Sequence, residues 1–318
     1  MTRGPLIATV TVNPALDVSV EVESLVADIK VPAVQYRRDP GGGGVNVSRM
    51  LARLGSRART VVVVGGSTGD ELVSKVEAEG LRVDVVPIDG QTRENLSVTD
   101  RTTGEQYRIV VPGAAVDHPD HLIDVVVSAV GDSSVVILSG GLAPGLDVSF
   151  YRRIAERLDE ATVIVDALEP QVLADVVTGS VAIVKPNVHE LGSIVDIGDG
   201  SDPQLAVAAR SVLERGSVEA IVLSLGSRGA LLVRREGPPT RFVAPRVAEV
   251  VSTTGAGDSL VAGIAHVISD GGSMSDAVLL GVAAGAATVA APGTQLGSHD
   301  EVRGLVGQVK VRTVEIDG

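Results

Sequence analysis

The sequence contains no cysteine and no tryptophan among its 318 residues, and aromatic residues make up only 2% of it. The absence of cysteine excludes disulfide bonds, thiolate zinc sites and a cysteine nucleophile. The scarcity of aromatic side chains counts against a surface that stacks the bases of single-stranded nucleic acid. A net charge of −13 counts against nucleic acid or an anionic membrane as a partner. We therefore expect small-molecule partners, with no nucleic acid and no membrane.

The sequence also lacks a targeting segment and a membrane span. The apolar run at 6–12 is too short for a signal peptide and leads into Asn13-Pro14. The longest apolar stretch, 277–291, is shorter than a membrane span and rich in alanine and glycine, which predicts a buried helix. Together with the absence of cysteine, these features predict a cytoplasmic protein.

Short runs of valine and isoleucine alternate with helical patterns along most of the chain. The runs predict strands at 7–12, 61–64, 135–138, 163–165, 181–184 and 221–225. Helices are expected at 47–54, where apolar residues follow the i, i+3, i+4, i+7 spacing, and after Gly69, Asp120, Val148 and Pro203. Strands that are apolar on both faces and alternate with helices predict an α/β fold. Its central sheet should be mainly parallel, with helices on both faces and ligands beyond the carboxyl ends of the strands.

Two stretches, at about 18–40 and 91–112, break this alternation. Residues 95–99 of the second alternate polar and apolar side chains, which is typical of a half-exposed strand. We expect the two stretches to form a small second β-sheet that acts as a lid. No linker divides the chain, so 1–318 is expected to be a single domain.

The first chemical motif is Thr254-Gly255-Ala256-Gly257-Asp258, which opens an apolar helix. The free N–H groups and positive dipole end of a helix can hold the negative charge that develops on a transferring phosphoryl group. An aspartate beside them can accept the proton of an attacking hydroxyl. The spacing alone fits equally well an Asp258 that caps or favours the start of the helix.

A second motif, Gly41-Gly42-Gly43-Gly44-Val45-Asn46, directly precedes the helix expected from Val47. Glycines let the backbone approach a ligand closely and adopt positive φ, but a flexible turn is the alternative. The run is not a Walker A loop, because no Lys-Ser or Lys-Thr follows it.

A third motif, Lys185-Pro186-Asn187, ends a predicted strand and is followed by Glu190. Asn187 and Glu190 have the spacing of an N-cap and its capping-box partner. They also suit a site around hydrated Mg²⁺, which takes few carboxylates together with waters and phosphates. Both interpretations stay open on the sequence.

Five motifs occur in an order that resembles the PfkB family of ribokinase-like sugar kinases. They are Asn13-Pro14-Ala15-Leu16-Asp17, the glycine run with Asn46, Lys185-Pro186-Asn187 with Glu190, Ser224-Leu225-Gly226, and Thr254 to Asp258. The resemblance extends from Asn13 to about Gly293. Within the family, the chain is similar to the minor-type 6-phosphofructokinases in Pro40 before the glycines, in 92–96 and in 104–108. Fructose-1-phosphate kinases commonly carry a lysine inside the glycine run, and this chain has none.

The resemblance implies a role for each matching residue. Asp258 is implied as the base, with Gly255, Ala256 and Gly257 forming an anion hole. Residues implied for the sugar are Asp17, Gly41, Gly42, Gly43, Gly44 and Asn46 for its hydroxyls, and Lys30, Arg93 and Ser139 for its phosphate. Residues implied for ATP are Lys185, Asn187, Ser224, Gly226, Gly229, Ala283 and Ala286. Glu190 and Asn187 are implied for Mg²⁺, through water, and Asp166 lies on the same rim.

The activity implied is transfer of phosphate from ATP to the C1 hydroxyl of fructose 6-phosphate by a homodimer. ATP and Mg²⁺ are the implied cofactors, and a monovalent cation such as K⁺ is a further candidate. Alternative acceptors are tagatose 6-phosphate, fructose 1-phosphate, an unphosphorylated sugar or a nucleoside. An alternative outside the enzymes is a catalytically silent protein that binds a sugar phosphate.

Two departures from the family pattern lie on the acceptor-phosphate side. Relatives carry a serine where this chain has Gly141, and a second basic residue where it has Pro32. Both departures concern the residues that would bind the acceptor's phosphate and not those implied for phosphoryl transfer. His118 and His121 could suggest a metal but lack other clear ligands, so they predict the start of a helix instead.

Overall fold

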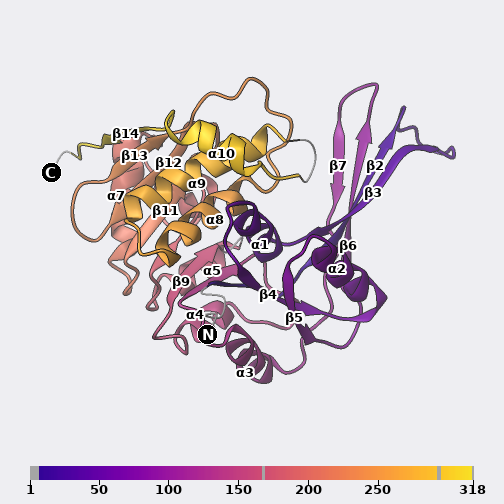
Figure 1. Cartoon of the computed structure of the whole chain (residues 1–318), viewed down its shortest axis with the longest axis horizontal. Coiled ribbons are helices and arrows are strands. Elements are labelled where there is room, and N and C mark those ends of the chain that lie inside the picture. Colours follow the sequence, from indigo (N-terminus) through magenta and orange to yellow (C-terminus); the bar gives the residue numbers. More distant parts are fainter. Residues whose placement is uncertain (1–6, 167–168, 292–294, 317–318) are drawn as a thin grey trace.

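The computed structural model describes residues 7–166, 169–291 and 295–316 (Figure 1). Within those ranges lies a ten-stranded sheet. In spatial order its strands are β14 (Lys310–Thr313), β13 (Thr240–Val243), β12 (Gly229–Arg234), β11 (Ala220–Ser224), β10 (Ile183–Val184), β9 (Thr162–Asp166), β8 (Val135–Ser139), β1 (Ile7–Thr11), β4 (Ala58–Val64) and β5 (Arg82–Pro87). Neighbours from β11 to β5 pair in parallel, whereas β12, β13 and β14 pair antiparallel. The mainly parallel sheet predicted from the sequence is confirmed.

Helices cover both faces of this sheet, because alternate residues of the strands enter different apolar clusters. On β4, Val61 and Val63 belong to one cluster, whereas Val62 and Val64 point to the other face. The first face packs against α3 (Pro119–Val130), α4 (Phe150–Ala155), α5 (Pro170–Val176), α6 (Val188–Gly192) and α7 (Asp202–Leu213). The second packs against α1 (Gly43–Arg53), α2 (Gly66–Ala78), α8 (Ala256–Ser269), α9 (Met274–Val289) and α10 (His299–Val306).

The small second sheet is also present and projects from one end of the molecule (Figure 1). Its order is β3 (Ala33–Gly41), β2 (Ala15–Val22), β6 (Arg93–Asp100) and β7 (Gln106–Ile109). The register sets Asp17 beside Asp39 and Asn95, so this face is polar. The opposite face carries apolar side chains that are about half exposed, namely Val34, Tyr36, Tyr107 and Ile109.

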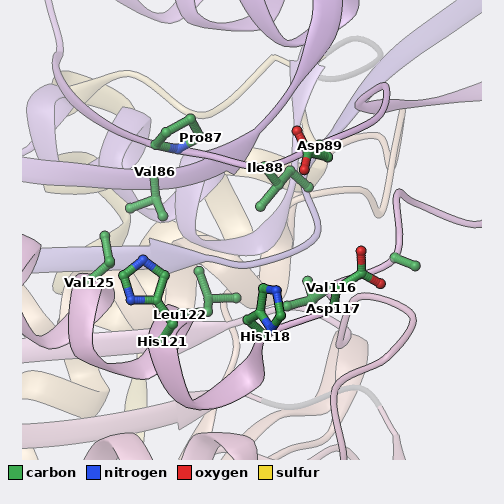
Figure 2. A pocket seen from close by; sticks show the side chains of 11 residues that line it. Val86, Pro87, Ile88, Asp89, Val116, Asp117, His118, His121, Leu122 and Val125 are labelled. Carbon is green, nitrogen blue, oxygen red and sulfur yellow. The ribbon is translucent and has the colours of Figure 1, made fainter.

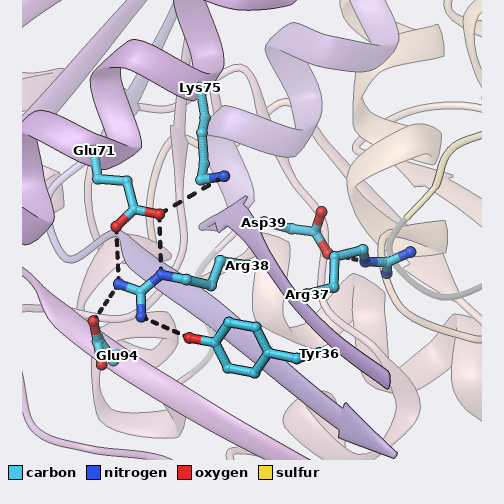
Figure 3. A network of polar contacts seen from close by, with 7 residues as sticks. All are labelled: Tyr36, Arg37, Arg38, Asp39, Glu71, Lys75 and Glu94. Atoms are coloured by element: carbon cyan, nitrogen blue, oxygen red, sulfur yellow. Dashed lines mark hydrogen bonds and ion pairs between the residues drawn. The ribbon is translucent and has the colours of Figure 1, made fainter. Parts of the chain in front are cut away.

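Arg38 joins the apolar face of the small sheet to the large sheet's helices (Figure 3). Its Nε and Nη2 donate to the two carboxylate oxygens of Glu71 on α2, at 3.0 and 2.9 Å. Nη2 also donates to Glu94 Oε1 at 2.5 Å, and Nη1 donates to the hydroxyl of Tyr36 at 3.1 Å. A two-point contact between a guanidinium and a carboxylate fixes orientation as well as distance, so the small sheet is held at a defined angle to α2.

Helices α8 and α9 pack unusually closely behind the motif that ends at Asp258. A Cβ atom added to Gly263 would lie 2.5 Å from the Cα of Gly281. The stretch 277–291, predicted as a buried helix, supplies most of α9. Among the described residues, no helix has both the length and the apolar character that crossing a bilayer requires.

This contact predicts opposite effects for two glycine-to-alanine changes in helices. Gly263→Ala should lower the free energy of unfolding by about 1–3 kcal/mol, because the backbone of α9 must move. Gly304→Ala on α10 is the matched control, since a Cβ there meets nothing within 4 Å. It should raise the free energy of unfolding by about 0.4–1 kcal/mol. Urea unfolding of both variants measures the difference, and equal shifts would contradict close α8–α9 packing.

Candidate active site

The motif around Asp258 begins helix α8, and Gly255 is its N-cap residue, with φ 78°. The alternative in which Asp258 caps the helix is therefore wrong, although Asp258 does lie in the first turn. Glycine offers no side-chain oxygen to the first turn, so the amide groups there stay available for an anion. The Nδ2 of Asn46, on α1, donates to Asp258 Oδ2 at 2.8 Å and fixes the carboxylate.

The surroundings of Asp258 bring its pKa into the working range of a base. The pKa of Asp258 is raised to about 7, chiefly by burial and secondly by the negative charge of Asp166, while the Asn46 hydrogen bond and Lys185 oppose the shift. A group with a pKa near neutrality can take up and release a proton at physiological pH. Asp258 keeps part of its surface open, so a substrate can reach it.

Lys185 provides a buried positive charge beside the start of α8. Its Nζ lies 2.9 Å from Asp166 Oδ1, and both side chains are buried. Burial is the largest single influence and would lower the pKa of Lys185, but the charge and hydrogen bond of Asp166 together with the charges of Glu190 and Asp258 outweigh it, so the pKa is raised. The same Nζ is 3.5 Å from the position that a Cβ on Gly257 would occupy. A cation and free amides thus meet at one place, as phosphate binding requires.

The glycine run lies where three other segments approach it. A Cβ on Gly41 would lie 2.2 Å from Asp17 Oδ2, and one on Gly43 would lie 2.2 Å from Ser139 Oγ. The backbone of Gly42 has a φ of 122°, a value that residues with a side chain rarely adopt. The glycines therefore serve close packing, and the flexible-turn alternative is wrong. Helix α1 also begins at Gly43, earlier than predicted, because the N–H of Asn46 already bonds to the Gly42 carbonyl at 3.0 Å.

The polar face of the small sheet carries residues that are predicted to bind the sugar. Asn95 Nδ2 donates to Asp17 Oδ1 at 3.0 Å, and Arg93 Nη2 donates to the Asn13 carbonyl at 3.0 Å. Burial raises the pKa of Asp17, whereas Asn95 and Arg93 lower it. The hydroxyl of Ser139 is buried and has no hydrogen-bond partner among the described residues, so it is available to a ligand.

Lys30 is the predicted sugar-site residue that the structure does not bring to this place. It is exposed in the loop between β2 and β3. That loop lies at the end of β2 opposite to Asp17, near the tip of the small sheet (Figure 1). Within one chain, Lys30 is therefore separated from Arg93 by the length of the strand.

Among the residues predicted for ATP and Mg²⁺, Asn187 and Glu190 form the capping box that their spacing allowed. Asn187 Oδ1 accepts from the N–H of Glu190 at 2.9 Å, and Glu190 Oε2 accepts from the N–H of Asn187 at 2.8 Å. Glu190 Oε1 also accepts from Asn187 Nδ2 at 2.7 Å. The capping prediction is confirmed, and the predicted role of the pair toward Mg²⁺ stays a prediction.

The other predicted nucleotide residues lie at the ends of the neighbouring elements. The N–H of Ser224 donates to the Pro186 carbonyl at 2.8 Å, which joins the two motifs. Gly226 and Gly229 flank the turn after β11 and have φ 58° and 98°. Ala283 and Ala286 are buried on α9.

A surface pocket of about 410 Å³ lies away from these residues, between β5 and α3 (Figure 2). Apolar side chains line it together with Asp89, Asp117, His118 and His121. His118 is the N-cap residue of α3, as predicted. Across 7–166, 169–291 and 295–316, no three His, Asp or Glu side chains form a group able to hold a metal ion. His121 lies in the first turn of α3, so both histidines are at the start of this helix.

Sequence reasoning missed three polar side chains of this region. Asn95 holds Asp17. Arg108 Nη2, on β7, donates to Thr254 Oγ1 at 3.3 Å and so spans from the small sheet to the Asp258 motif. Glu169 Oε1 accepts from the N–H of Leu142 at 3.1 Å. Only the strand register could have revealed Asn95, through its place beside Asp17.

Comparison with known proteins identifies the family. The model of the pfkB family of carbohydrate kinases matches residues 10–301, so the chain belongs to this family. The ATP-dependent 6-phosphofructokinase isozyme 2 of Mycobacterium tuberculosis (strain CDC 1551 / Oshkosh) is 36% identical over 302 residues, 94% of this chain and 88% of the relative. The enzyme of the same name from Escherichia coli (strain K12) is 33% identical over 93% of this chain and 96% of the relative. A 1-phosphofructokinase of Bacillus subtilis (strain 168) is 30% identical over 96% of this chain and 99% of the relative.

Solved structures agree with this assignment. Phosphofructokinase-2 from Escherichia coli in complex with potassium superimposes with a TM-score of 0.88 at 32% identity, over 96% of this chain and 99% of that one. The complex of the same enzyme with fructose-6-phosphate gives 0.86 at 31% identity, with the same coverage. Arabidopsis thaliana ribokinase, at 21% identity and a TM-score of 0.78, shows the shared fold alone. The chain is thus a ribokinase-like phosphotransferase whose acceptor is a hydroxyl group.

Proposed function

We propose that this chain is an ATP-dependent 6-phosphofructokinase, which converts fructose 6-phosphate and ATP into fructose 1,6-bisphosphate and ADP. One observation carries the proposal: Asp258 lies at the start of α8 with a pKa of about 7, next to free amides and to Lys185. The names of the relatives from M. tuberculosis and E. coli support the choice of acceptor.

In the proposed reaction, Asp258 takes the proton from the C1 hydroxyl of the sugar. The hydroxyl oxygen then bonds to the γ-phosphorus of ATP as the bond from that phosphorus to the bridging oxygen breaks, and ADP leaves with the electron pair. Negative charge spreads over the transferring oxygens during this step. The amides of Gly255, Ala256 and Gly257 and the ammonium of Lys185 stabilise that charge most strongly where water is excluded.

Acceptor binding follows from the sugar side of the site. Asp17, Asn46 and the glycine run (Gly41, Gly42, Gly43 and Gly44) are proposed to bind the sugar hydroxyls. Arg93 and the unpartnered hydroxyl of Ser139 are proposed to bind the phosphate of the acceptor. Because Lys30 lies at the tip of the small sheet, any contact with the phosphate would have to come from a second copy of the chain.

Cofactor binding is proposed on the opposite side. Lys185, Asn187, Ser224, Gly226, Gly229, Ala283 and Ala286 are proposed to bind ATP. Each carboxylate oxygen of Glu190 accepts hydrogen bonds from Asn187 and keeps lone pairs for further donors, which suits the water shell of Mg²⁺. This ion would neutralise charge on the ATP phosphates. The E. coli complex with potassium supports a monovalent cation as a further ligand.

We also propose a cytoplasmic homodimer in which the small sheet acts as a lid on one α/β domain. The apolar face of that sheet is half exposed at Val34, Tyr36, Tyr107 and Ile109, and a face of this kind favours association with a second copy. The E. coli relative has been described as a tetramer in an inhibited form, so higher assembly is compatible with this architecture.

The acceptor series tests the proposal. Steady-state kinetics with ATP and MgCl₂ should give fructose 6-phosphate the highest kcat/KM among fructose 6-phosphate, tagatose 6-phosphate, fructose 1-phosphate and fructose. The B. subtilis relative makes fructose 1-phosphate the second candidate acceptor. A higher kcat/KM for fructose 1-phosphate would replace the proposed activity with that one. ATP binding without turnover of any acceptor would indicate a silent binding protein.

A further inference from the structure

Glu169 is a charged residue that the proposed reaction does not use, although it lies at the edge of the acceptor site. It is the N-cap residue of α5, and its side chain reaches the turn that follows Ser139. Its Oε1 accepts from the N–H of Leu142 at 3.1 Å. Its Oε2 is buried and has no hydrogen-bond partner among the described residues. A buried carboxylate oxygen without a donor is costly, which calls for an explanation.

The carboxylate fills the space beside Gly141. A Cβ on Gly141 would lie only 2.7 Å from Glu169 Oε1 and 3.6 Å from Oε2. A side chain at position 141 and the observed position of Glu169 therefore exclude each other. A negatively charged group thus occupies the place where a serine at 141 would present a neutral hydroxyl.

A chain of hydrogen bonds connects Glu169 to Arg93. The Leu142 carbonyl accepts from Asn13 Nδ2 at 2.8 Å, and the Asn13 carbonyl accepts from Arg93 Nη2 at 3.0 Å. The two charges also interact directly: burial lowers the pKa of Arg93, whereas Asp17 and Glu169 raise it. Arg93 is the proposed ligand of the acceptor's phosphate, so Glu169 acts on the same cation.

We propose that Glu169 is a specificity-determining residue, whose negative charge opposes the phosphate of the acceptor and so limits the preference for phosphorylated over unphosphorylated sugars. This inference rests on the proposed function. The phosphate and Glu169 compete for the positive charge of Arg93, and like charges repel more strongly in a partly buried site of low effective dielectric constant than in bulk water. The charge affects binding of the phosphate in the ground state and in the transition state alike, so KM changes while kcat does not.

The variant Glu169→Gln separates charge from packing, because its amide oxygen can still accept from Leu142. Its KM for fructose 6-phosphate should fall about three- to tenfold, because the repulsion between the Glu169 carboxylate and the acceptor's phosphate is removed. A tenfold change in KM corresponds to about 1.4 kcal/mol of binding free energy. Its kcat, its KM for ATP and its KM for fructose should stay within about twofold of the wild-type values. The ratio of kcat/KM between fructose 6-phosphate and fructose should rise accordingly.

Two controls separate this effect from a structural one. Glu160→Gln removes the same charge at an exposed position and should leave every constant unchanged. Gly141→Ala should change the KM for fructose 6-phosphate in the wild-type background, because the added Cβ displaces the Glu169 carboxylate, and have little effect in Glu169→Ala, where there is no carboxylate to displace. An unchanged or higher KM in Glu169→Gln overturns the inference while the wild type remains active. A wild type that does not phosphorylate fructose 6-phosphate instead refutes the proposed function.

Discussion

Asp258→Asn should lower kcat by about 10²–10⁴-fold, because an amide cannot accept the proton of the attacking hydroxyl. ATP binding should remain near the wild-type level, since Lys185 and the amides at the start of α8 are unchanged. Asparagine has almost the shape of aspartate and can keep a hydrogen bond with Asn46, so the variant should fold. Steady-state kinetics together with calorimetric titration of ATP measure both quantities.

The pH dependence provides the second part of this prediction. Because the pKa of Asp258 is raised to about 7, the deprotonated, active form is lost as the pH falls below that value. The kcat/KM of the wild type should therefore drop about tenfold per pH unit below pH 7, as expected for one required base. The residual activity of Asp258→Asn serves as the control, because its pH profile reports the ionisation of the substrates alone. Wild-type kcat in the variant would contradict the assignment of the base.

Arg93→Gln is expected to produce the second large effect, on acceptor binding rather than on chemistry. A hydrogen bond to a charged group contributes about 1.5–3 kcal/mol, so KM for fructose 6-phosphate should rise about 10- to 100-fold. The KM for fructose should change little, since fructose carries no phosphate that Arg93 could bind. The discrimination between the two sugars should fall by the same factor, as measured by their kcat/KM values.

Arg157→Gln is the matched control for this variant, because Arg157 forms an exposed ion pair with Asp124 of α3. Exposed pairs contribute about 0–1 kcal/mol to stability and nothing to acceptor binding here. Equal losses for fructose and fructose 6-phosphate in Arg93→Gln would show that Arg93 supports the fold of the site and does not bind the phosphate.

The parallel part of the fold was predictable because its strands are buried on both faces and appear as unbroken apolar runs. Strand β14 was not, since all four of its residues are exposed and its pairing with β13 depends on distant chain segments. Strand β5 lies at the sheet edge and mixes exposed with buried residues, which weakens the apolar pattern. Periodicity reports burial, so edge strands leave little trace in the sequence.

The candidate site was predictable where several ordered motifs supported one another. On the sequence Asp258 fitted a helix cap as well as a base; the structure places Gly255 at the N-cap and so excludes the cap, while the role as base stays a prediction. Glu169 had no such pattern, because its importance comes from its distance to Gly141 and Leu142, which are far away in sequence. Lys30 is the opposite case, because the sequence predicted a contact that one chain does not make. The resemblance implied that Lys30 binds the acceptor's phosphate, whereas the length of β2 places it at the tip of the small sheet.

The most direct test of the central claim identifies the product of wild-type turnover. With ATP, MgCl₂ and fructose 6-phosphate, ³¹P NMR should show one new phosphate ester on C1 of the sugar, formed in equal amount to ADP. This product would agree with a kinase whose base, Asp258, deprotonates the C1 hydroxyl. Formation of ADP and free phosphate without a bisphosphate, or a new ester at any other carbon, would contradict it.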